Sequence, residues 1–404
     1  MDPHVVVETV WRMESAKIVA TLARLVRDVG LAEELAQDTL VIALEQWPAD
    51  GVPENPASWL MATAKHRAVD LLRRQSRYRE KLAEIGRSTA PHDDPDLAAD
   101  ADDYVRDDLL RLIFTTCHPV LSTESRVALT LRLLGGLSTG EIARACLVPE
   151  PTVGKRITRA KRTLAEKRVP IELPPPAEAA ARLASVLKVI YLIFNEGYAA
   201  TAGDDWTRPA LCTEALRLGR ILAGLAPDEP EVHGLVALME LQSSRIPART
   251  TADGAPVLLQ DQDRRRWDRL LVRRGLDALA RAAGTYGPYV LQAEIAACHA
   301  RARTPGDTDW VRVAALYEVL SYVSPSPVVD LNRAVAIGHA EGPARALAIV
   351  DTLVLPGYPL LPAVRGDLLE KLGRADEARA EFRRAAAMTG NARERSIFTA
   401  RAGE

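Results

Sequence analysis

The chain is poor in cysteine, which limits the covalent and metal chemistry it can support. Its 404 residues include four cysteines, Cys117, Cys146, Cys212 and Cys298, which stand far apart and form no C-x-x-C pair. This spacing excludes a disulfide framework and a zinc site, and it is typical of reduced, buried thiols in a cytosolic protein. We therefore expect no metal ion and no cofactor.

Long apolar runs are also absent. The most apolar stretch, residues 183–194, is interrupted by Lys188 and is too short to cross a bilayer. The N-terminus lacks the basic and then apolar segments of a secretion signal. These absences predict a cytoplasmic protein that makes no contact with a membrane.

Common catalytic motifs are missing as well. The chain contains no P-loop, no G-x-G-x-x-G and no H-E-x-x-H sequence. Its Cys-His pairs, at 117–118 and 298–299, are adjacent in sequence, so on a helix their side chains diverge by about 100° and cannot act as nucleophile and base. We expect no enzymatic activity. One enzymatic alternative stays open, in which Glu196, Tyr198 and Asp263 bind and convert a small molecule.

Aromatic residues make up only 5% of the chain, although 48% of its residues are hydrophobic. This balance favours helices that pack through alanine and leucine, and few segments alternate with the period of two that a strand requires. The length allows two or three domains. The sequence therefore predicts an all-α protein.

Charge is nearly balanced overall, with a formal net charge of −2, but it is unevenly placed. Residues 65–81 and 144–168 carry an excess of lysine and arginine, which favours contact with nucleic acid. The segment between them is acidic and contains a single cation, Arg106, among eight aspartates. The aspartates are Asp93, Asp94, Asp96, Asp100, Asp102, Asp103, Asp107 and Asp108. With Pro91 and Pro95, this acidic segment is typical of a disordered tether.

The most informative segment is residues 137–164, which has the pattern of a helix-turn-helix. Ser138 and Glu141 form an S-x-x-E capping box, which predicts a helix from Thr139 to about Cys146. A second helix is expected from about Pro151, a residue that suits the first helical position. This geometry lays a recognition helix in the major groove of DNA.

The second helix of this pair is amphipathic. Its apolar stripe consists of Val153, Ile157, Ala160 and Leu164. Its opposite face carries Lys155, Arg156, Arg159 and Arg162. The alternative is that this basic face is simply exposed to solvent and binds no DNA.

Residues 5–80 are expected to form the first of the two basic helical modules, ahead of the helix-turn-helix. Within a helix at residues 32–44, Leu35, Thr39 and Ile42 share one face, and the polar side carries Glu33, Glu34, Gln37 and Asp38. A loop is expected at residues 47–56. The helix that follows is apolar along Leu60, Ala64 and Ala68, and cationic opposite.

The order of these motifs resembles that of an extracytoplasmic-function (ECF) sigma factor. The motifs are A-E-E-L-A-Q-D-T at residues 32–39, W-L-x-x-x-A-x-H-R-x-x-D-x-x-R-R at 59–74, an acidic linker, and P-T-V-x-x-R-I-x-R-A-K at 151–161. The resemblance implies a sigma-2 domain at residues 5–80, an acidic linker at 81–106 and a sigma-4 helix-turn-helix domain at 107–168. It also implies two partners, core RNA polymerase (through its β′ and β subunits) and promoter DNA.

The resemblance also implies a role for individual residues. Polymerase contacts would come from Leu35, Gln37, Asp38 and Thr39. The −10 element would be met by Asn55, Trp59, Lys65, His66, Arg67, Arg73 and Arg74. The −35 element would be met by Thr152, Lys155, Arg156, Arg159 and Arg162. Two structural alternatives stay open: Trp59 as ordinary core, and Asp70 as a partner of Arg67 or Arg74.

The remaining chain, residues 177–404, follows a stiff Pro-Pro-Pro spacer at 174–176. An internal repeat with a shift of 32 relates Ala334, Ala346 and Val350 to Gly366, Ala378 and Phe382. This region resembles the tetratricopeptide-repeat-like (TPR-like) regulatory domain of an ECF subgroup, and residues 363–382 read as one TPR helix pair.

Several segments of this region mix aromatic with polar residues. They make a candidate groove for a protein or small-molecule ligand from Asn195, Glu196, Tyr198, Asp263, Arg266, Trp267 and Asn332. Alternatively, these polar groups cap and bridge helices. A different function also stays open, a helix-turn-helix regulator with a TPR interaction domain that binds DNA without polymerase.

Overall fold

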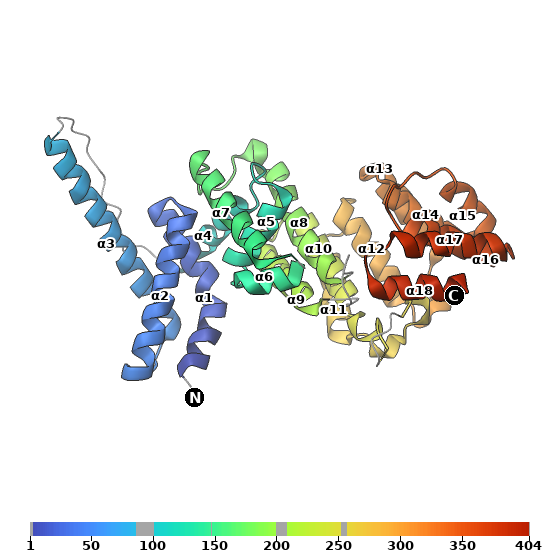
Figure 1. Ribbon diagram of the computed structural model, residues 1–404, viewed down its shortest axis with the longest axis horizontal. Helices are drawn as coiled ribbons and strands as arrows, with labels where there is room; N and C mark the ends of the chain where they lie inside the picture. The colour runs from blue at the N-terminus through green and yellow to red at the C-terminus, as the bar shows by residue number, and fades with distance from the viewer. Residues whose placement is uncertain (1–2, 86–100, 147, 199–207, 252–256, 404) are drawn as a thin grey trace. The chain divides into compact units, whose positions relative to one another are not determined.

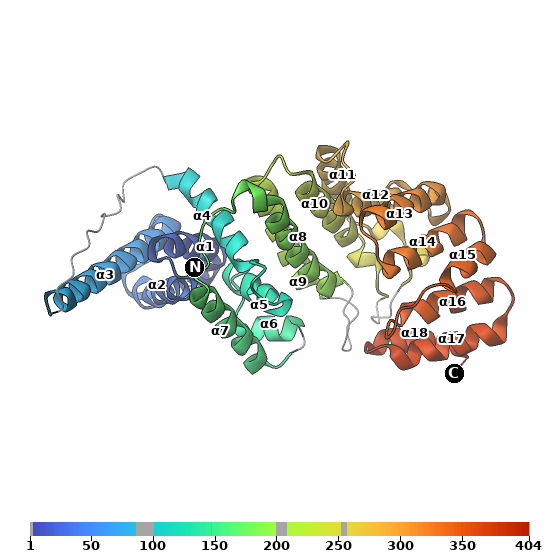
Figure 2. The same cartoon turned by 90° about the horizontal axis from the view of Figure 1, so that it is seen from above.

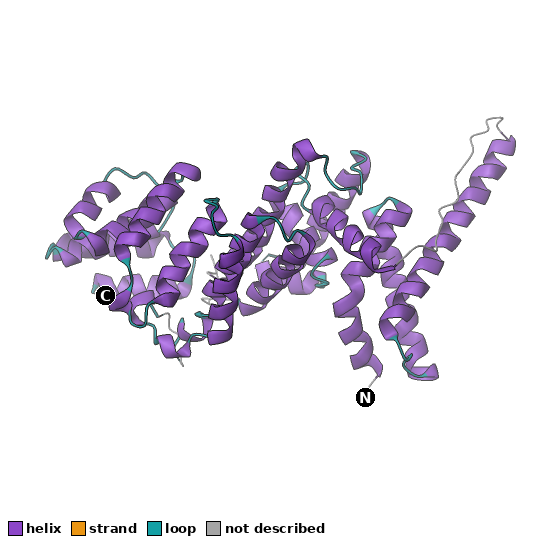
Figure 3. Ribbon diagram, turned by 180° about the vertical axis from the view of Figure 1, so that it is seen from behind, coloured by secondary structure: helices purple, strands orange, loops and turns teal. Residues whose placement is uncertain are grey.

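The computed structural model describes residues 3–85, 101–146, 148–198, 208–251 and 257–403. Within these ranges the chain forms helices joined by turns and loops, with no β-strand, which confirms the all-α class (Figure 3). The chain forms two compact units, Met1–Val189 and Ile190–Glu404.

The first unit begins with three helices, α1 (Pro3–Val26), α2 (Val29–Asp50) and α3 (Pro56–Ile85), which pack on one another (Figure 1). The sequence predicted a loop from residue 47, but α2 continues through Pro48 to Asp50. Proline removes a helical hydrogen bond. Burial of Trp47, whose ring meets Trp59 edge-on at 5.5 Å, offsets that loss by holding the last turn against α3.

Helix α4 (Ala101–Thr116) begins inside the segment expected to be an acidic linker. Asp108 is buried and accepts hydrogen bonds from Arg24 of α1 and Arg111 of α4, so it belongs to the core and not to a tether. Two cations offset the cost of burying this carboxylate. Of the linker expected at residues 81–106, residues 81–85 belong to α3 and residues 101–106 to α4, while residues 86–100 lie outside the described residues.

The helix-turn-helix is confirmed. Helices α5 (Thr123–Leu133), α6 (Thr139–Cys146) and α7 (Glu150–Glu166) lie side by side (Figures 1 and 2). The capping box forms as predicted: the Ser138 N–H donates to Glu141 Oε2 (2.7 Å), and the Glu141 N–H donates to Ser138 Oγ (3.2 Å). All four residues of the predicted stripe on α7 are buried.

Gly154 lies inside α7, where a built Cβ would meet no atom within 4 Å. Since glycine in a helix costs about 1 kcal/mol relative to alanine, we expect Gly154→Ala to raise the free energy of unfolding by about 0.5–1 kcal/mol. Gly366→Ala is the contrast, because its Cβ would lie 3.0 Å from the Phe382 ring. A urea titration of each variant measures both changes, and a loss of stability in Gly154→Ala contradicts the expectation.

Helix α8 (Pro176–Tyr198) joins the two units. Its first half is bonded to the first unit: Arg182 donates to the Phe114 carbonyl (3.0 Å) and Ser185 Oγ to the Cys117 carbonyl (2.8 Å). The boundary between compact units therefore lies within α8, later than the predicted start at residue 177.

The second unit is a series of short helices. They are α9 (Pro209–Leu225), α10 (Pro230–Ser243), α11 (Arg269–Arg281), α12 (Pro288–Arg301), α13 (Trp310–Val323), α14 (Pro327–Ala340), α15 (Pro343–Val350), α16 (Leu360–Lys371), α17 (Ala375–Met388) and α18 (Ala392–Ala402). Short 3-10 turns include η3 (Arg264–Arg266). From α11 onward each helix packs on its neighbours in sequence, as in repeat arrays.

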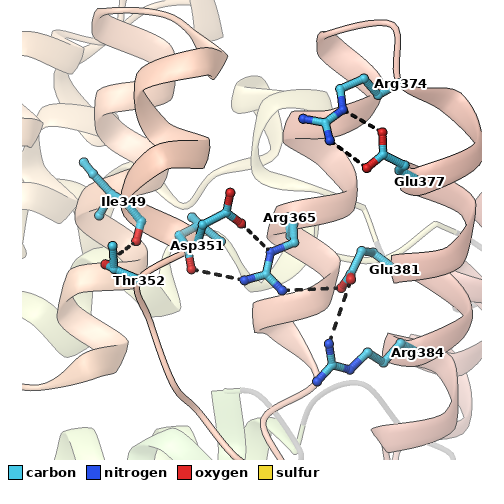
Figure 4. Close-up of polar contacts among 9 residues, drawn as sticks. Ile349, Asp351, Thr352, Arg365, Arg374, Glu377, Glu381 and Arg384 are labelled. Carbon is cyan, nitrogen blue, oxygen red and sulfur yellow. Dashed lines mark hydrogen bonds and ion pairs between the residues drawn. The ribbon is translucent and has the colours of Figure 1, made fainter.

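The last helices carry the internal repeat. Four of its six predicted positions are less than 2% exposed: Ala334, Ala346, Val350 and Phe382. Gly366 has no Cβ, which lets the Phe382 ring approach α16 closely. Arg365 links α15 to α17, because its Nε donates to Asp351 (2.9 Å) while its Nη1 lies 3.9 Å from Glu381 (Figure 4). These contacts hold α15, α16 and α17 together.

Candidate nucleic-acid interface

Helix α7 presents a cationic face opposite its buried stripe. Lys155, Arg159 and Arg162 are exposed, while Thr152 and Arg156 are half-buried on the same side. Arg162 lies 3.4 Å from Glu166 in an exposed pair that contributes little stability. The structure therefore brings the five predicted −35 residues together on one side of α7.

A neighbouring cation of α7 points elsewhere. Lys161 Nζ lies 2.5 Å from Glu33 Oε2 of α2, and Arg132 Nε of α5 donates to Glu33 Oε1 at 2.6 Å. The sequence placed Glu33 on the polar side of α2, but its side chain is buried. The ion pairs with two cations offset the desolvation of its carboxylate. This triad joins the first helical module to the helix-turn-helix.

Two of the residues expected at the outer surface of α2 are instead buried. Leu35 is 6% exposed and Thr39 is fully buried, with Thr39 Oγ1 donating to the Leu35 carbonyl (2.9 Å). They belong to the apolar face that packs inside the unit, so they do not contribute to the exposed surface, whereas Gln37 and Asp38 do.

The exposed face of α2 contains apolar residues that the sequence analysis missed. Val41 is 51% exposed and Leu44 is 36% exposed, close to Asp38 and Glu45 on the same helix. The sequence does indicate these exposed residues, because the run at residues 40–44 holds more apolar residues than one buried stripe needs. Exposed apolar side chains with acidic neighbours are typical of a protein-docking surface.

The start of α3 is fixed by local bonds. Asn55 Oδ1 accepts from the Ser58 N–H (3.1 Å), and the Asn55 carbonyl accepts from the Trp59 N–H (3.1 Å). The half-buried Trp59 ring packs edge-on against Trp47. These contacts give both residues a structural role, and for Trp59 they favour the alternative of ordinary core.

The basic residues of α3 lie along its outer side. His66, Arg67, Arg73 and Arg74 are exposed, and Lys65 is half-buried. Arg67 Nη2 donates to Asp38 Oδ2 of α2 at 2.6 Å, so Asp38, and not Asp70, is the partner of Arg67. The expected polymerase surface and the expected −10 surface are therefore in direct contact.

The groove candidates of the second unit do not all meet. Asn195, Asp263, Arg266 and Asn332 are exposed. Bonds from Arg265 hold the pKa of Asp263 below its ordinary value, and Glu196 pairs with Arg208. These pairings do not support proton transfer through Glu196 and Asp263. Tyr198 and Trp267 instead lie against buried arginines.

His299 gives the second unit a pH dependence. Its side chain is buried, and burial, reinforced by Arg245 and Arg264, lowers its pKa to about 4. Since an unfolded histidine titrates near 6.5, the unfolded state binds more protons between these values. The stability from neutral His299 is therefore present above about pH 6.5 and is lost as pH falls toward 4.

We expect the free energy of unfolding of the second unit to fall with pH in this window by up to about 1.4 kcal/mol per pH unit from this residue. His299→Gln should remove that slope, because glutamine does not titrate. Urea titrations at several pH values measure the difference between the two proteins. Identical slopes for wild type and variant contradict the expectation.

No helix in the described ranges has both the length and the apolar character needed to span a bilayer.

Comparisons with known proteins match the two basic modules and part of the remainder. Sigma-70 region 2 matches residues 11–78, and sigma-70 region 4 matches residues 111–164. A family of unknown function, DUF6596, matches residues 182–283. No solved structure matches the chain.

Several relatives share these regions. Uncharacterized protein R00370 of Rhizobium meliloti (strain 1021) is 46% identical over 381 residues, which cover 93% of this chain and 90% of the relative. ECF RNA polymerase sigma factor SigC of Mycobacterium tuberculosis (strain CDC 1551 / Oshkosh) is 32% identical over 148 residues, 36% of this chain and 75% of the relative. ECF RNA polymerase sigma factor SigK of Mycobacterium ulcerans (strain Agy99) is 29% identical over 154 residues, which cover 37% of this chain and 78% of the relative. With both sigma-70 regions in order and these relatives, the chain belongs to the ECF sigma factors of the sigma-70 family.

Proposed function

We propose that this protein binds core RNA polymerase and directs promoter-specific initiation of transcription. The observation that carries the proposal is the presence of two helices, α3 and α7, that each expose cations opposite a buried stripe within the matched sigma-70 regions. Neutralising phosphates requires such cationic faces.

Each surface then has a role in the complex. The exposed face of α2, with Gln37, Asp38, Val41 and Leu44, docks on polymerase through its β′ and β subunits. The α3 cations follow the phosphates of a melted −10 strand, which needs a cationic groove and pockets for unstacked bases. The α7 face enters the major groove at the −35 element.

The second unit, in this proposal, is a TPR-like regulatory domain with a protein or small-molecule ligand, and the protein acts in the cytoplasm. The support is its array of short helices, including the repeat with a shift of 32, whose helices are stabilised by their neighbours. An array of that kind offers an extended surface for binding.

Run-off transcription with core polymerase tests the proposal. The full chain should give specific transcripts from its promoter, and core polymerase alone should not. A regulator that acts without polymerase, the alternative function, would add nothing to core polymerase in this reaction. The absence of any specific transcript across a genomic promoter library contradicts the proposal.

We expect the second unit to be needed for full activity in the cell. The chain to compare should end at Val189, because an end at residue 168 would also remove the bonds of Arg182 and Ser185 to α4 and the turn after it. Reporter transcription should fall with the shortened chain at equal protein level. Equal transcription from both chains would show that the second unit does not regulate activity.

A further inference from the structure

Three arginines gather inside the second unit. Arg249 and Arg264 are 6% and 7% exposed, and Arg245 is half-buried. The guanidinium carbons of Arg245 and Arg264 lie 5.5 and 5.2 Å from the Trp267 ring, and that of Arg249 lies 3.7 Å over the Tyr198 ring. Aromatic faces attract the cations but do not neutralise them.

Arg245 and Arg264 reach only neutral acceptors. Arg245 donates to the side chains of Gln242 (2.9 Å) and Gln262 (3.4 Å). Arg264 donates to the carbonyls of His299 (2.6 Å) and Ala302 (2.7 Å) and to Thr308 Oγ1 (3.2 Å). Neither arginine forms an ion pair with a carboxylate in the part of the chain that the structure describes.

A buried charge is normally paired, because its desolvation is costly. Burial lowers the pKa of both arginines, and each also feels the charge of a neighbouring arginine. A guanidinium nevertheless keeps its proton in proteins. Asp307 acts on Arg264 only at a distance, without an ion pair. Arg245 and Arg264 therefore carry positive charge that no ion pair among the described residues compensates.

The same cluster contains buried polar atoms without a hydrogen-bond partner among the described residues. They are Tyr198 Oη, Arg264 Nε, Trp267 Nε1 and His299 Nδ1. Such atoms are uncommon in folded proteins. Arg264 Nε and Trp267 Nε1 can only donate, and a tyrosine hydroxyl can donate as well. The site thus lacks acceptors and negative charge together.

We propose that this cluster binds a small oxyanion, a phosphate or carboxylate group, between α8, the turn that holds Arg264, and α12. An oxyanion supplies the missing charge and several acceptor lone pairs at once. The burial of the donors excludes a duplex backbone as the occupant, because a duplex cannot enter the interior of the unit. The inference does not depend on whether the chain acts with polymerase.

A neighbouring pocket provides room for the rest of such a ligand. It measures about 410 Å³ and is lined by Ala302, whose carbonyl accepts from Arg264, and by Asp307. Arg301, Arg303 and Arg312 also line it. Asp309 lines the pocket too, and Glu294 pairs with both Arg301 and Arg312. The pocket therefore offers space of mixed charge, and the preference for an anion comes from the buried arginines.

The test uses the full chain and two probes, inorganic phosphate and citrate, titrated at constant ionic strength with chloride. Thermal unfolding and calorimetry should show a saturable rise in Tm and a defined Kd for one of them, since a ligand of the folded state stabilises it. A response to phosphate identifies a phosphoryl ligand, and a response to citrate a carboxylate ligand. No saturable response to either anion overturns the proposal.

Two variants and one control substitution separate a specific site from a general salt effect. Tyr198→Phe keeps the ring under Arg249 and removes only the hydroxyl, so affinity for the anion should fall about tenfold. Without anion, its stability should not fall, because no hydrogen bond is lost. Arg264→Gln should abolish binding, and Tyr286→Phe, at an exposed tyrosine, should bind like wild type. Wild-type affinity in Tyr198→Phe together with a wild-type rise in Tm in Arg264→Gln overturns the proposal.

Discussion

Glu33→Ala is expected to lower the free energy of unfolding of the first unit by about 3–5 kcal/mol, the usual cost of removing one partner from a buried ion pair. Glu33 is 6% exposed and is the shared partner of Arg132 and Lys161. Its loss leaves two largely buried cations without their carboxylate. Hydrogen exchange of α2, α5 and α7 amides, with urea titration of the full chain, measures the change.

The matched control is Glu34→Ala, the exposed neighbour on the same helix. Surface substitutions of this kind usually change stability by less than about 0.5 kcal/mol. If Glu33→Ala and Glu34→Ala had the same effect, the triad would not hold α2 to the helix-turn-helix.

Arg156→Ala and Arg159→Ala are expected to weaken promoter binding by the holoenzyme by about 1–3 kcal/mol each, or roughly tenfold for every 1.4 kcal/mol. Both lie on the outer face of α7, opposite the stripe that anchors the helix. Affinity for core polymerase should be unchanged, because the proposed docking surface is on α2.

The control for this pair is Lys167→Ala, an exposed cation just beyond the end of α7. Fluorescence anisotropy with a labelled promoter duplex, with and without the −35 sequence, separates specific from general binding. Wild-type affinity in both arginine variants would mean that another surface reads the −35 element.

Local chemistry made the helix-turn-helix predictable. The capping box of Ser138 and Glu141, together with Pro151 at the start of α7, sets boundaries that depend on neighbouring residues alone. The end of α2 was not predictable in this way. Its last turn depends on the packing of Trp47 against Trp59, two residues in different helices, and this tertiary contact outweighs the effect of Pro48.

The candidate surfaces were predicted only in part for a similar reason. Helical spacing placed Leu35 and Thr39 on the same face as Ile42, and the structure shows that Leu35 and Thr39 are buried, so the docking role suggested for these two by family resemblance does not fit. The burial of Glu33 and of Asp108 depends on cations distant in sequence, Lys161 and Arg24. No local pattern identifies such partners.

The arginine cluster illustrates the same limit in the second unit. Trp267 and Tyr198 were singled out from their aromatic and polar surroundings, whereas Arg245, Arg249 and Arg264 were not. For Arg245 and Arg264, the lack of an ion pair with a carboxylate among the described residues becomes evident only once the helices are packed.

The most direct measurement of the central claim is a footprint of the cognate promoter with and without core polymerase. A sigma factor should protect the −10 and −35 elements only when core polymerase is present, and potassium permanganate should then detect melting near −10. Protection by the chain alone, unchanged by core polymerase and without melting, would contradict the account and identify the protein as an independent DNA-binding regulator.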